Sequence, residues 1–404
     1  MRLSKKSFRV NFYFTLMYFV FMLSEGISAG NPLYALSVSI ENIKLKYILL
    51  VIGLGYYILS FVRSKKTLPH FQDETRTILI MVLVLAFITI IKQVQNGFMS
   101  SSYNEVFFLL APLLYVYFVV NDKNIKVRSL INIAFVIQCV VFLLDIISKL
   151  NLQNIRSINF MNSYSPFESE HSFYALVFFI YYLYNNNKFR TILSFIICFL
   201  AFKRLAVAVC IVLFIFKILG KDSFLEGGIS QKSVIILTII YSIIPIAYRG
   251  VLTTGFQRWF FNLTNIDFSY FVTGRLYRTQ LCIETPMLYG LGSTTEFLKN
   301  ALPGAINRNL HNDILRIYLE CGLLGSITLS YCYFKASSKS KISTILMLYL
   351  FTDMLFNHFL GAGRTAFWIL IYFVIYYFNA EYSHSTNKKV SFNENRYPDI
   401  SSSI

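Results

Sequence analysis

The stretch "RTILIMVLVLAFITIIK", from Arg76 to Lys92, has no charged residue between its two ends. Its length approaches the roughly 20 apolar residues that a helix needs to cross a bilayer. The rest of the chain has the same character, since 56% of its 404 residues are hydrophobic and only 14% are charged. This composition excludes a soluble globular protein and predicts an integral membrane protein.

Other apolar stretches of similar length predict an all-α, polytopic fold with about twelve transmembrane helices. An alternative of about eleven spans stays open, because only Lys203 and Arg204 interrupt the stretch 189–219. No regular repeat and no pair of matching broken spans is evident. The predicted spans are 10–26, 45–62, 76–92, 103–120, 129–148, 171–185, 189–202, 205–219, 233–248, 311–334, 342–360 and 365–380.

Lys and Arg residues predict the orientation, since short connections rich in them stay on the cytoplasmic side. The N-terminal segment "MRLSKKSFR" and every second connection after it are basic, which places both termini in the cytoplasm. The long segment 249–310 then falls outside. Residues 1–382 are thus predicted to form a single transmembrane domain with one long outer loop, and 383–404 a polar, disordered cytoplasmic tail.

The net charge of +17 is explained by these inner connections, and no basic segment alternates with exposed aromatic residues in a soluble domain. We therefore expect no nucleic-acid partner. Of the six cysteines, only Cys282 lies in the outer loop, and no CxxC pair or His/Cys cluster has the spacing of a zinc site. Neither a metal nor a cofactor is expected.

The span "LHNDILRIYLECGLLG", from Leu310 to Gly325, is unusually polar at its start. Asn312, Arg316 and Glu320 are four residues apart and share one helix face, which Asp313 joins. A charge at span depth costs at least about 2.5–3.5 kcal/mol, so this face is expected to meet a partner or a water-filled cavity. One interpretation is that Arg316 and Glu320 pair with each other and hold helices together; it does not exclude a cavity beside them.

His311 lies at the mouth of the same span, where an imidazole can reach both water and a substrate. Its unperturbed pKa of about 6.5 suits proton transfer. A lone interfacial histidine is also compatible with a purely structural role.

The outer loop supplies cations in the stretch "VTGRLYRTQLCIETPMLYGLGSTTEF", whose third and fourth residues are Gly274 and Arg275. A short amphipathic helix is predicted to follow. Arg275 and Arg278 are one helical turn apart, a spacing that fits a phosphate or diphosphate. Gly290-Leu291-Gly292 lacks the strand-then-helix setting of a nucleotide site, so it predicts a tight turn whose backbone can approach a ligand.

These motifs together resemble the signature of the O-antigen polymerase and O-antigen ligase superfamily. The matching order is Gly274-Arg275, Pro286, Gly290-Leu291-Gly292, His311-Asn312 and Glu320-Cys321-Gly322-Leu323-Leu324-Gly325. The resemblance implies a multi-span glycosyltransferase of the bacterial inner membrane, acting at the periplasmic face on sugars carried by undecaprenyl diphosphate. The closest resemblance is to the polymerase, Wzy type, which transfers a growing chain to another lipid-linked repeat unit.

Two alternatives stay open. An O-antigen ligase of the same superfamily would transfer the finished chain to the lipid A core. A lipid-linked sugar exporter, or flippase, would have a similar number of spans, but its charges should be spread through the spans of both halves. The resemblance further implies membrane lipids, a chain-length regulator and a flippase as partners, and a product that is O-antigen or a related surface polysaccharide.

The resemblance also suggests residue roles. Departure of a diphosphate needs its charge stabilised, and the acceptor hydroxyl needs a base. His311 is the candidate for activating or orienting that hydroxyl, with Asn312 holding it. Arg275 is the first candidate for the diphosphate and Arg204 the second. The remaining predicted substrate-binding residues are Lys203, Arg278, Arg316, Glu320, Glu170 and Arg364.

The Lys203-Arg204 pair and Glu170 also have interpretations that involve no substrate. Lys203 and Arg204 could simply extend their side chains to the membrane interface. Glu170, in "SPFESEHSF", could bind sugar hydroxyls or act as an acid or base. It could equally be part of a helix N-terminus, where a carboxylate is favourable.

Overall fold

The computed structural model describes residues 5–28, 30–63, 72–122, 125–157, 166–201, 203–220, 225–265, 267, 276–285, 289–303, 310–361 and 364–394. Within these ranges the regular structure is entirely helical and contains no strand. The expectation of an all-α fold is therefore confirmed for the part of the chain that the structure describes.

Each apolar stretch identified in the sequence coincides with a helix, and the outer segment adds three short ones. The helices are α1 (Lys5–Gly26), α2 (Tyr34–Asn42), α3 (Leu45–Arg63), α4 (Asp73–Asn96), α5 (Ser100–Val120), α6 (Val127–Ile146), α7 (Leu152–Arg156), α8 (His171–Tyr184), α9 (Lys188–Leu200), α10 (Arg204–Ile218), α12 (Gln231–Val251), α13 (Thr254–Thr264), α15 (Leu276–Glu284), α16 (Ser293–Ala301), α17 (Asp313–Ser337), α18 (Lys341–Asp353) and α19 (Thr365–Glu394), with a 3-10 turn at Ile147–Lys149.

The prediction of about twelve spans is wrong. In the described residues only α4, α5, α6 and α12 are long and apolar enough to cross a membrane, and the count rises to 5 if α2 and α3, bent by 53° at their junction, form one span. Helices α8, α9 and α18 have 14, 13 and 13 residues. At 1.5 Å per residue such helices reach about 20 Å, short of a hydrocarbon core of about 30 Å. The apolar helices remain consistent with a membrane-embedded chain.

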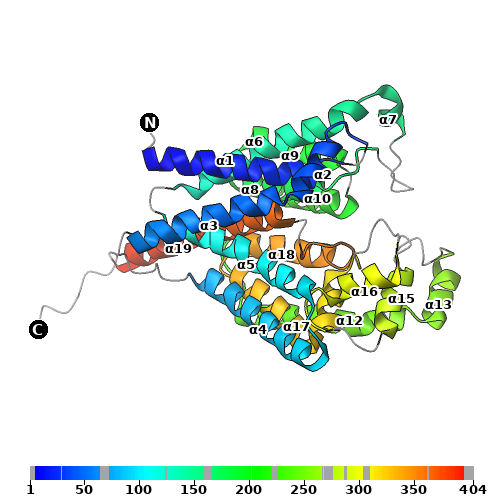
Figure 1. Ribbon diagram of the computed structural model, residues 1–404. Coiled ribbons are helices and arrows are strands. Elements are labelled where there is room, and N and C mark those ends of the chain that lie inside the picture. The colour runs from blue at the N-terminus through cyan, green and yellow to red at the C-terminus, as the bar shows by residue number, and fades with distance from the viewer. Residues whose placement is uncertain are drawn as a thin grey trace, which may run out of the picture.

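The bundle has two distinct ends, which Figure 1 shows on its left and right sides. We call the end where α1 begins and α19 finishes the terminal end, and the opposite end, which carries α13, α15 and α16, the loop end. Successive long helices alternate in direction between these ends (Figure 1). The described helices of the segment 249–310 therefore lie away from the start of α1 and the end of α19.

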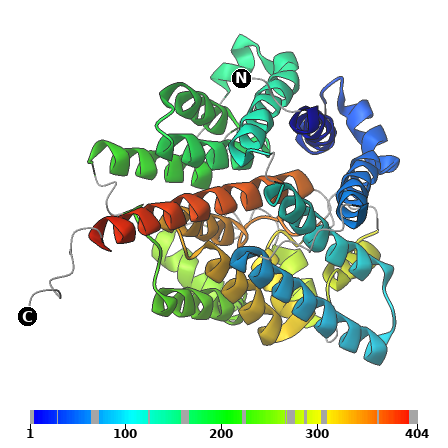
Figure 2. The same cartoon turned by 90° about the vertical axis from the view of Figure 1, so that its left-hand side faces the viewer.

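Helix α19 runs between two groups of helices, as Figure 2 shows. It contacts α1, α6 and α8 on one side and α5, α17 and α18 on the other. Within the second group, α17 packs against both α4 and α12. The side chains of α8 are almost all buried, from His171 to Leu183. This packing makes α8, α17 and α19 central to the fold and places their loop-end termini next to one another.

Two segments depart from the expected boundaries. The predicted span 342–360 is helical only as far as Asp353, after which the chain turns, with the Asn357 amide donating to Asp353 Oδ1 at 2.7 Å. Apolar residues continue past this turn, so hydropathy alone did not indicate it. Helix α19 continues to Glu394, past the boundary at residue 382 that the sequence predicts for the transmembrane domain, while residues 395–404 lie outside the described residues.

Candidate functional site

Charged side chains gather at the loop end, because the helix termini that carry them all face that way. We call Glu105, Asp313, Arg316, Glu320 and His358 the charged cluster. They belong to the start of α5, the first two turns of α17 and the segment after α18. Sequence analysis had placed Asp313, Arg316 and Glu320 on one helix face, and the structure adds the two partners from elsewhere in the chain.

Asp313, at the first turn of α17, is fully buried and accepts from several donors. Its Oδ1 lies 2.9 Å from His358 Nδ1 and 3.2 Å from Arg316 Nε. Its Oδ2 accepts the backbone N–H of Leu360 at 2.7 Å and also that of Phe359. The carboxylate therefore holds the 354–361 segment against the start of α17, and orients the His358 ring.

Arg316 is buried beside Asp313 and bridges three elements. One terminal nitrogen donates to the Leu360 carbonyl at 2.9 Å, and both terminal nitrogens lie 3.4 Å from Glu105 Oε2. The interpretation that Arg316 pairs with Glu320 is thus corrected, because its ion-pair partners are Glu105 and Asp313. Such a network satisfies most of the charge that a buried guanidinium would otherwise leave uncompensated.

Glu320 instead reaches the loop segment. Its Oε1 accepts the backbone N–H of Thr294 at 3.0 Å, near the start of α16. Next to it α17 is kinked, with Gly322 at φ 73° and ψ −172°. Lys92 of α4 donates to the Glu320 carbonyl at 2.9 Å. The break in the helix therefore frees backbone polar groups that residues of neighbouring elements satisfy.

The Gly290-Leu291-Gly292 motif forms the tight turn that was predicted. Both glycines have positive φ, 99° and 82°. The Leu291 N–H donates to Thr89 Oγ1 at 3.1 Å, and its carbonyl accepts from Ser102 Oγ at 2.6 Å. The turn thus docks on α4 and α5 and brings the start of α16 to Glu320. Its observed partners are protein groups, and the idea that it approaches a ligand stays a prediction.

A Gly290→Ala substitution is expected to destabilise the protein by about 1–3 kcal/mol, because an L residue at this φ is strained. An added Cβ would also lie 2.7 Å from the Thr89 side chain and 2.8 Å from its backbone. The unfolding midpoint of the purified protein in detergent checks this. Gly255→Ala is the matched control, since nothing lies within 4 Å of its added Cβ. Equal midpoints for the two variants would contradict the role of the turn.

His311 and Asn312 precede α17 and have different environments. His311 is partly exposed and adopts φ 53°. Asn312 is buried, and its Oδ1 caps α17 by accepting the Leu315 N–H at 2.9 Å. The predicted substrate-holding side chain of Asn312 is therefore engaged as a helix cap, whereas His311 is partly exposed directly before α17 and its role stays a prediction.

The predicted cations are not all available for a diphosphate. Arg364 is buried and ion-paired with Glu170, the residue before α8, and its guanidinium lies 5.7 Å from the ring centre of Phe173. Burial lowers the pKa of Arg364 to about 10, which leaves it charged at neutral pH. Both proposed roles of Glu170, in sugar binding and in acid–base chemistry, thus compete with this ion pair.

Lys203 pairs with Glu168 at 2.6 Å, so it is neutralised rather than simply extended toward an interface. Arg204 has an exposed side chain at the start of α10, and Arg278 a partly exposed one on α15. Arg275, together with Gly274 and Pro286, lies outside the described residues. Among the predicted cations that the structure describes, Arg204 and Arg278 are therefore the ones with accessible side chains.

Segment 249–310 packs onto the site through a small apolar core. Cys282 of α15, Leu298 of α16 and Leu315 of α17 are buried together with Leu310. Burial raises the pKa of Cys282 to about 12, and the charge of Glu320 adds to this shift. The predicted amphipathic helix after Arg275 is confirmed as α15, and it rests beside the charged cluster.

A second group of buried charges lies at the same end. Lys46, at the start of α3, is buried and lies 2.6 Å from Glu41 and 3.7 Å from Glu25. Tyr174 of α8 donates to Glu25 at 2.8 Å. The sequence analysis missed this group and also Glu105 and His358. In the sequence, the signal that could have indicated these residues is a single charged or ionisable residue inside an otherwise apolar stretch.

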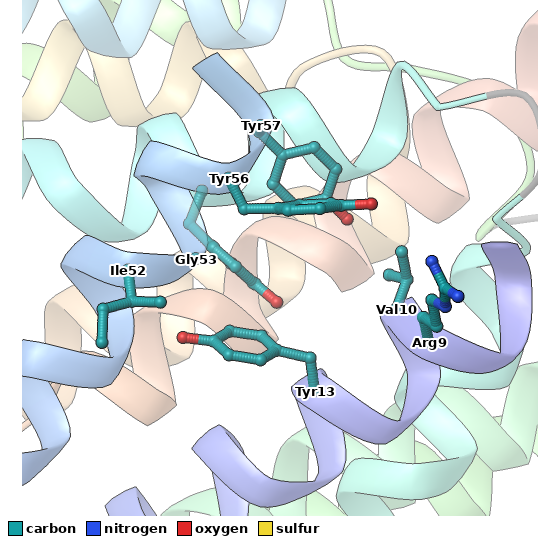
Figure 3. A pocket seen from close by; sticks show the side chains of 8 residues that line it. Arg9, Val10, Tyr13, Ile52, Gly53, Tyr56 and Tyr57 are labelled. Carbon is teal, nitrogen blue, oxygen red and sulfur yellow. The ribbon is translucent and has the colours of Figure 1, made fainter. Parts of the chain in front are cut away.

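The described cavities lie elsewhere. One, of about 210 Å³, is lined by Arg9, Val10, Tyr13, Ile52, Gly53, Tyr56, Tyr57 and Tyr115 of α1, α3 and α5 (Figure 3). Its lining residues come from the halves of these helices nearer the terminal end, away from the charged cluster. A wider apolar groove of about 410 Å³ lies between α10 and α18. Neither contains the convergent charges of the loop end, so the charged cluster is the better candidate for chemistry.

Protein-family models, curated proteins and solved structures give no match to this chain. Among the described residues, no group of three or more His, Cys, Asp or Glu side chains could hold a metal ion. The geometry of the loop end and the motifs in the sequence therefore provide the indications of function.

Proposed function

We propose that this chain is a glycosyltransferase of the O-antigen polymerase type. It would polymerise undecaprenyl-diphosphate-linked repeat units into O-antigen or a related surface polysaccharide. Its location would be the bacterial inner membrane, with the loop end in the periplasm and both termini in the cytoplasm. Membrane lipids, a chain-length regulator and a flippase would be its partners.

The observation that supports this proposal best is the charged cluster beneath His311. Asp313 and Arg316 are buried at the end of an apolar helical bundle, where isolated charges are costly. They lie together with an imidazole and two further carboxylates, next to a loop that carries arginines. Sugar transfer from a lipid diphosphate needs an acid–base group and cations at one membrane face, and this end of the molecule offers both kinds of residue.

Within this proposal, the diphosphate is bound by Arg275, Arg278 and Arg204, the cations predicted from the sequence for this face. His311 orients or activates the acceptor hydroxyl from the mouth of the site. Arg364 and Lys203, which have carboxylate partners, shape the surroundings of the site. Glu170 acts through Arg364.

The charges buried most deeply lie at the loop end, whereas Lys339 and Asp73, paired at the terminal end, are exposed. This favours an enzyme over an exporter, since a lipid-linked sugar exporter should distribute its polar residues through both halves of the bundle. An O-antigen ligase would share the same donor and the same arrangement of charges. Polymerase and ligase are therefore separated by their products.

The test is the lipopolysaccharide gel profile of a strain that lacks this gene, complemented with the wild type or with His311→Ala at equal protein level. The deletion is expected to leave core carrying a single repeat, and His311→Ala is expected not to restore the ladder. Lys299→Ala, an exposed residue of α16, is the control and should restore it fully. Bare core after deletion would point to a ligase or an exporter, and an unchanged ladder would remove O-antigen assembly from the proposal.

A further inference from the structure

His358 has the surroundings of an acid–base group. Its Nδ1 lies 2.9 Å from Oδ1 of the buried Asp313. When Nδ1–H donates to this carboxylate, the lone pair of the neutral ring is left on Nε2. The same carboxylate stabilises the imidazolium that forms when Nε2 takes a proton. The ring is thus held in one orientation with its accepting nitrogen directed away from Asp313.

The side chains of His358 and Glu105 both approach Gly361 closely. A Cβ at Gly361 would lie 3.0 Å from His358 Nε2 and 3.3 Å from Glu105 Oε1. Gly361 has φ 134°, which L side chains rarely adopt, and these two atoms leave no room for a side chain at this position. Both polar atoms accept hydrogen bonds, so Nε2 can accept from the reacting hydroxyl and Glu105 Oε1 from a neighbouring hydroxyl of the same sugar.

Exposure also singles out these two residues. The side chains of Asp313 and Arg316 are 0% and 1% exposed, whereas those of His358 and Glu105 are 17% and 12% exposed. A substrate that reaches the cluster from the surface meets His358 and Glu105 before the residues behind them. Asp313 and Arg316 then act through them as positioning residues.

We propose that His358 is the general base of the transfer, with the reacting hydroxyl of the acceptor sugar donating to His358 Nε2 and a neighbouring hydroxyl of that sugar donating to Glu105 Oε1. This inference rests on the proposed function and deepens it, because it assigns the proton acceptor to a residue outside the His311-Asn312 motif. His311 is then left with the orientation of the acceptor sugar.

The step balances as follows. The acceptor oxygen forms a bond to the anomeric carbon of the donor, while the bond from that carbon to the diphosphate oxygen breaks and its electron pair leaves with the lipid diphosphate. The hydroxyl proton moves to His358 Nε2, and the resulting imidazolium is stabilised by Asp313 and by the carboxylate of Glu105. Water at the exposed edge of the ring then takes this proton and restores the base.

The experiment measures turnover of an undecaprenyl-diphosphate-linked repeat unit by the purified full-length protein. His358→Asn is the decisive variant, since an asparagine amide can still donate to Asp313 but has no equivalent of Nε2. We expect kcat to fall by about 10²–10⁴-fold, with the KM for the acceptor and the unfolding midpoint near those of the wild type. Added imidazole should partly restore the rate of His358→Ala. Turnover of His358→Asn within about threefold of wild type would overturn the proposal.

Glu105→Gln provides a second test of the proposal, which can be used if His358→Asn folds poorly. It preserves size and hydrogen bonding to Arg316 but removes the charge beside Gly361, so the KM for the acceptor should rise by about tenfold, on the order of one charge-assisted hydrogen bond. An unchanged KM would overturn the assigned position of the hydroxyl. If the wild-type protein forms no polymer, the proposed function is wrong, and the assignment of His358 as its base is wrong with it. If the wild type is active and His358→Asn is equally active, only the assignment of His358 is wrong.

Discussion

Asp313→Ala is expected to lower the free energy of unfolding by about 3–5 kcal/mol, the usual cost of removing one partner from a buried ion pair. The substitution leaves Arg316 without one of its two carboxylate partners and His358 Nδ1 without its hydrogen-bond partner. The backbone N–H groups of Phe359 and Leu360 lose theirs as well. Each of these donors is buried or partly buried, and each unmade hydrogen bond adds to the loss.

The unfolding midpoint in detergent and the protein level in membranes measure this effect. Asp313→Asn, which keeps one acceptor oxygen, should lose less than Asp313→Ala. Glu168→Ala is the matched control, because Glu168 is 43% exposed in its pair with Lys203 and such pairs contribute at most about 1 kcal/mol. If Asp313→Ala is no less stable than Glu168→Ala, Asp313 does not hold the 354–361 segment in place.

Arg316→Met is the second substitution expected to have a large effect, again about 3–5 kcal/mol. Methionine fills much of the space but leaves the carboxylates of Asp313 and Glu105 without their cation, and the Leu360 carbonyl without its donor. The two negative charges then repel each other in a poorly solvated region.

A double substitution separates charge from packing in this result. Glu105→Gln added to Arg316→Met should recover part of the lost stability, because it removes one of the two unpaired charges and makes the effects non-additive. Arg258→Met, at an exposed position of α13, should change the midpoint little. Simple additivity of Arg316→Met and Glu105→Gln would show that their ion pair is not an important contact.

Helix positions could be predicted well because each long apolar stretch must satisfy its own backbone hydrogen bonds, and a helix does so locally. The number of spans could not, since composition does not reveal where an apolar stretch stops being helical. Residues 354–361 illustrate this. They include Leu355, Phe356 and Phe359, yet they form a turn whose backbone is satisfied by Asp313 rather than by helix continuation.

The candidate site could be predicted only in part, for a related reason. Helical spacing placed Asp313 and Arg316 on one face of α17, because neighbours three residues apart meet on any helix. Their partners Glu105 and His358 lie 211 and 45 residues away from them along the chain. Nothing in a single sequence specifies such distant pairs, so Glu320 was the nearest available partner for Arg316 and the wrong one.

The shared position of the two chain ends has a practical consequence for handling this protein. Since α1 begins and α19 finishes at the terminal end (Figure 1), an affinity tag or fluorescent protein fused to either terminus is kept clear of the charged cluster. A split reporter with one half fused before α1 and the other after α19 would have both halves attached at the terminal end. Antibodies directed at α16 would then label the opposite side of the same molecule.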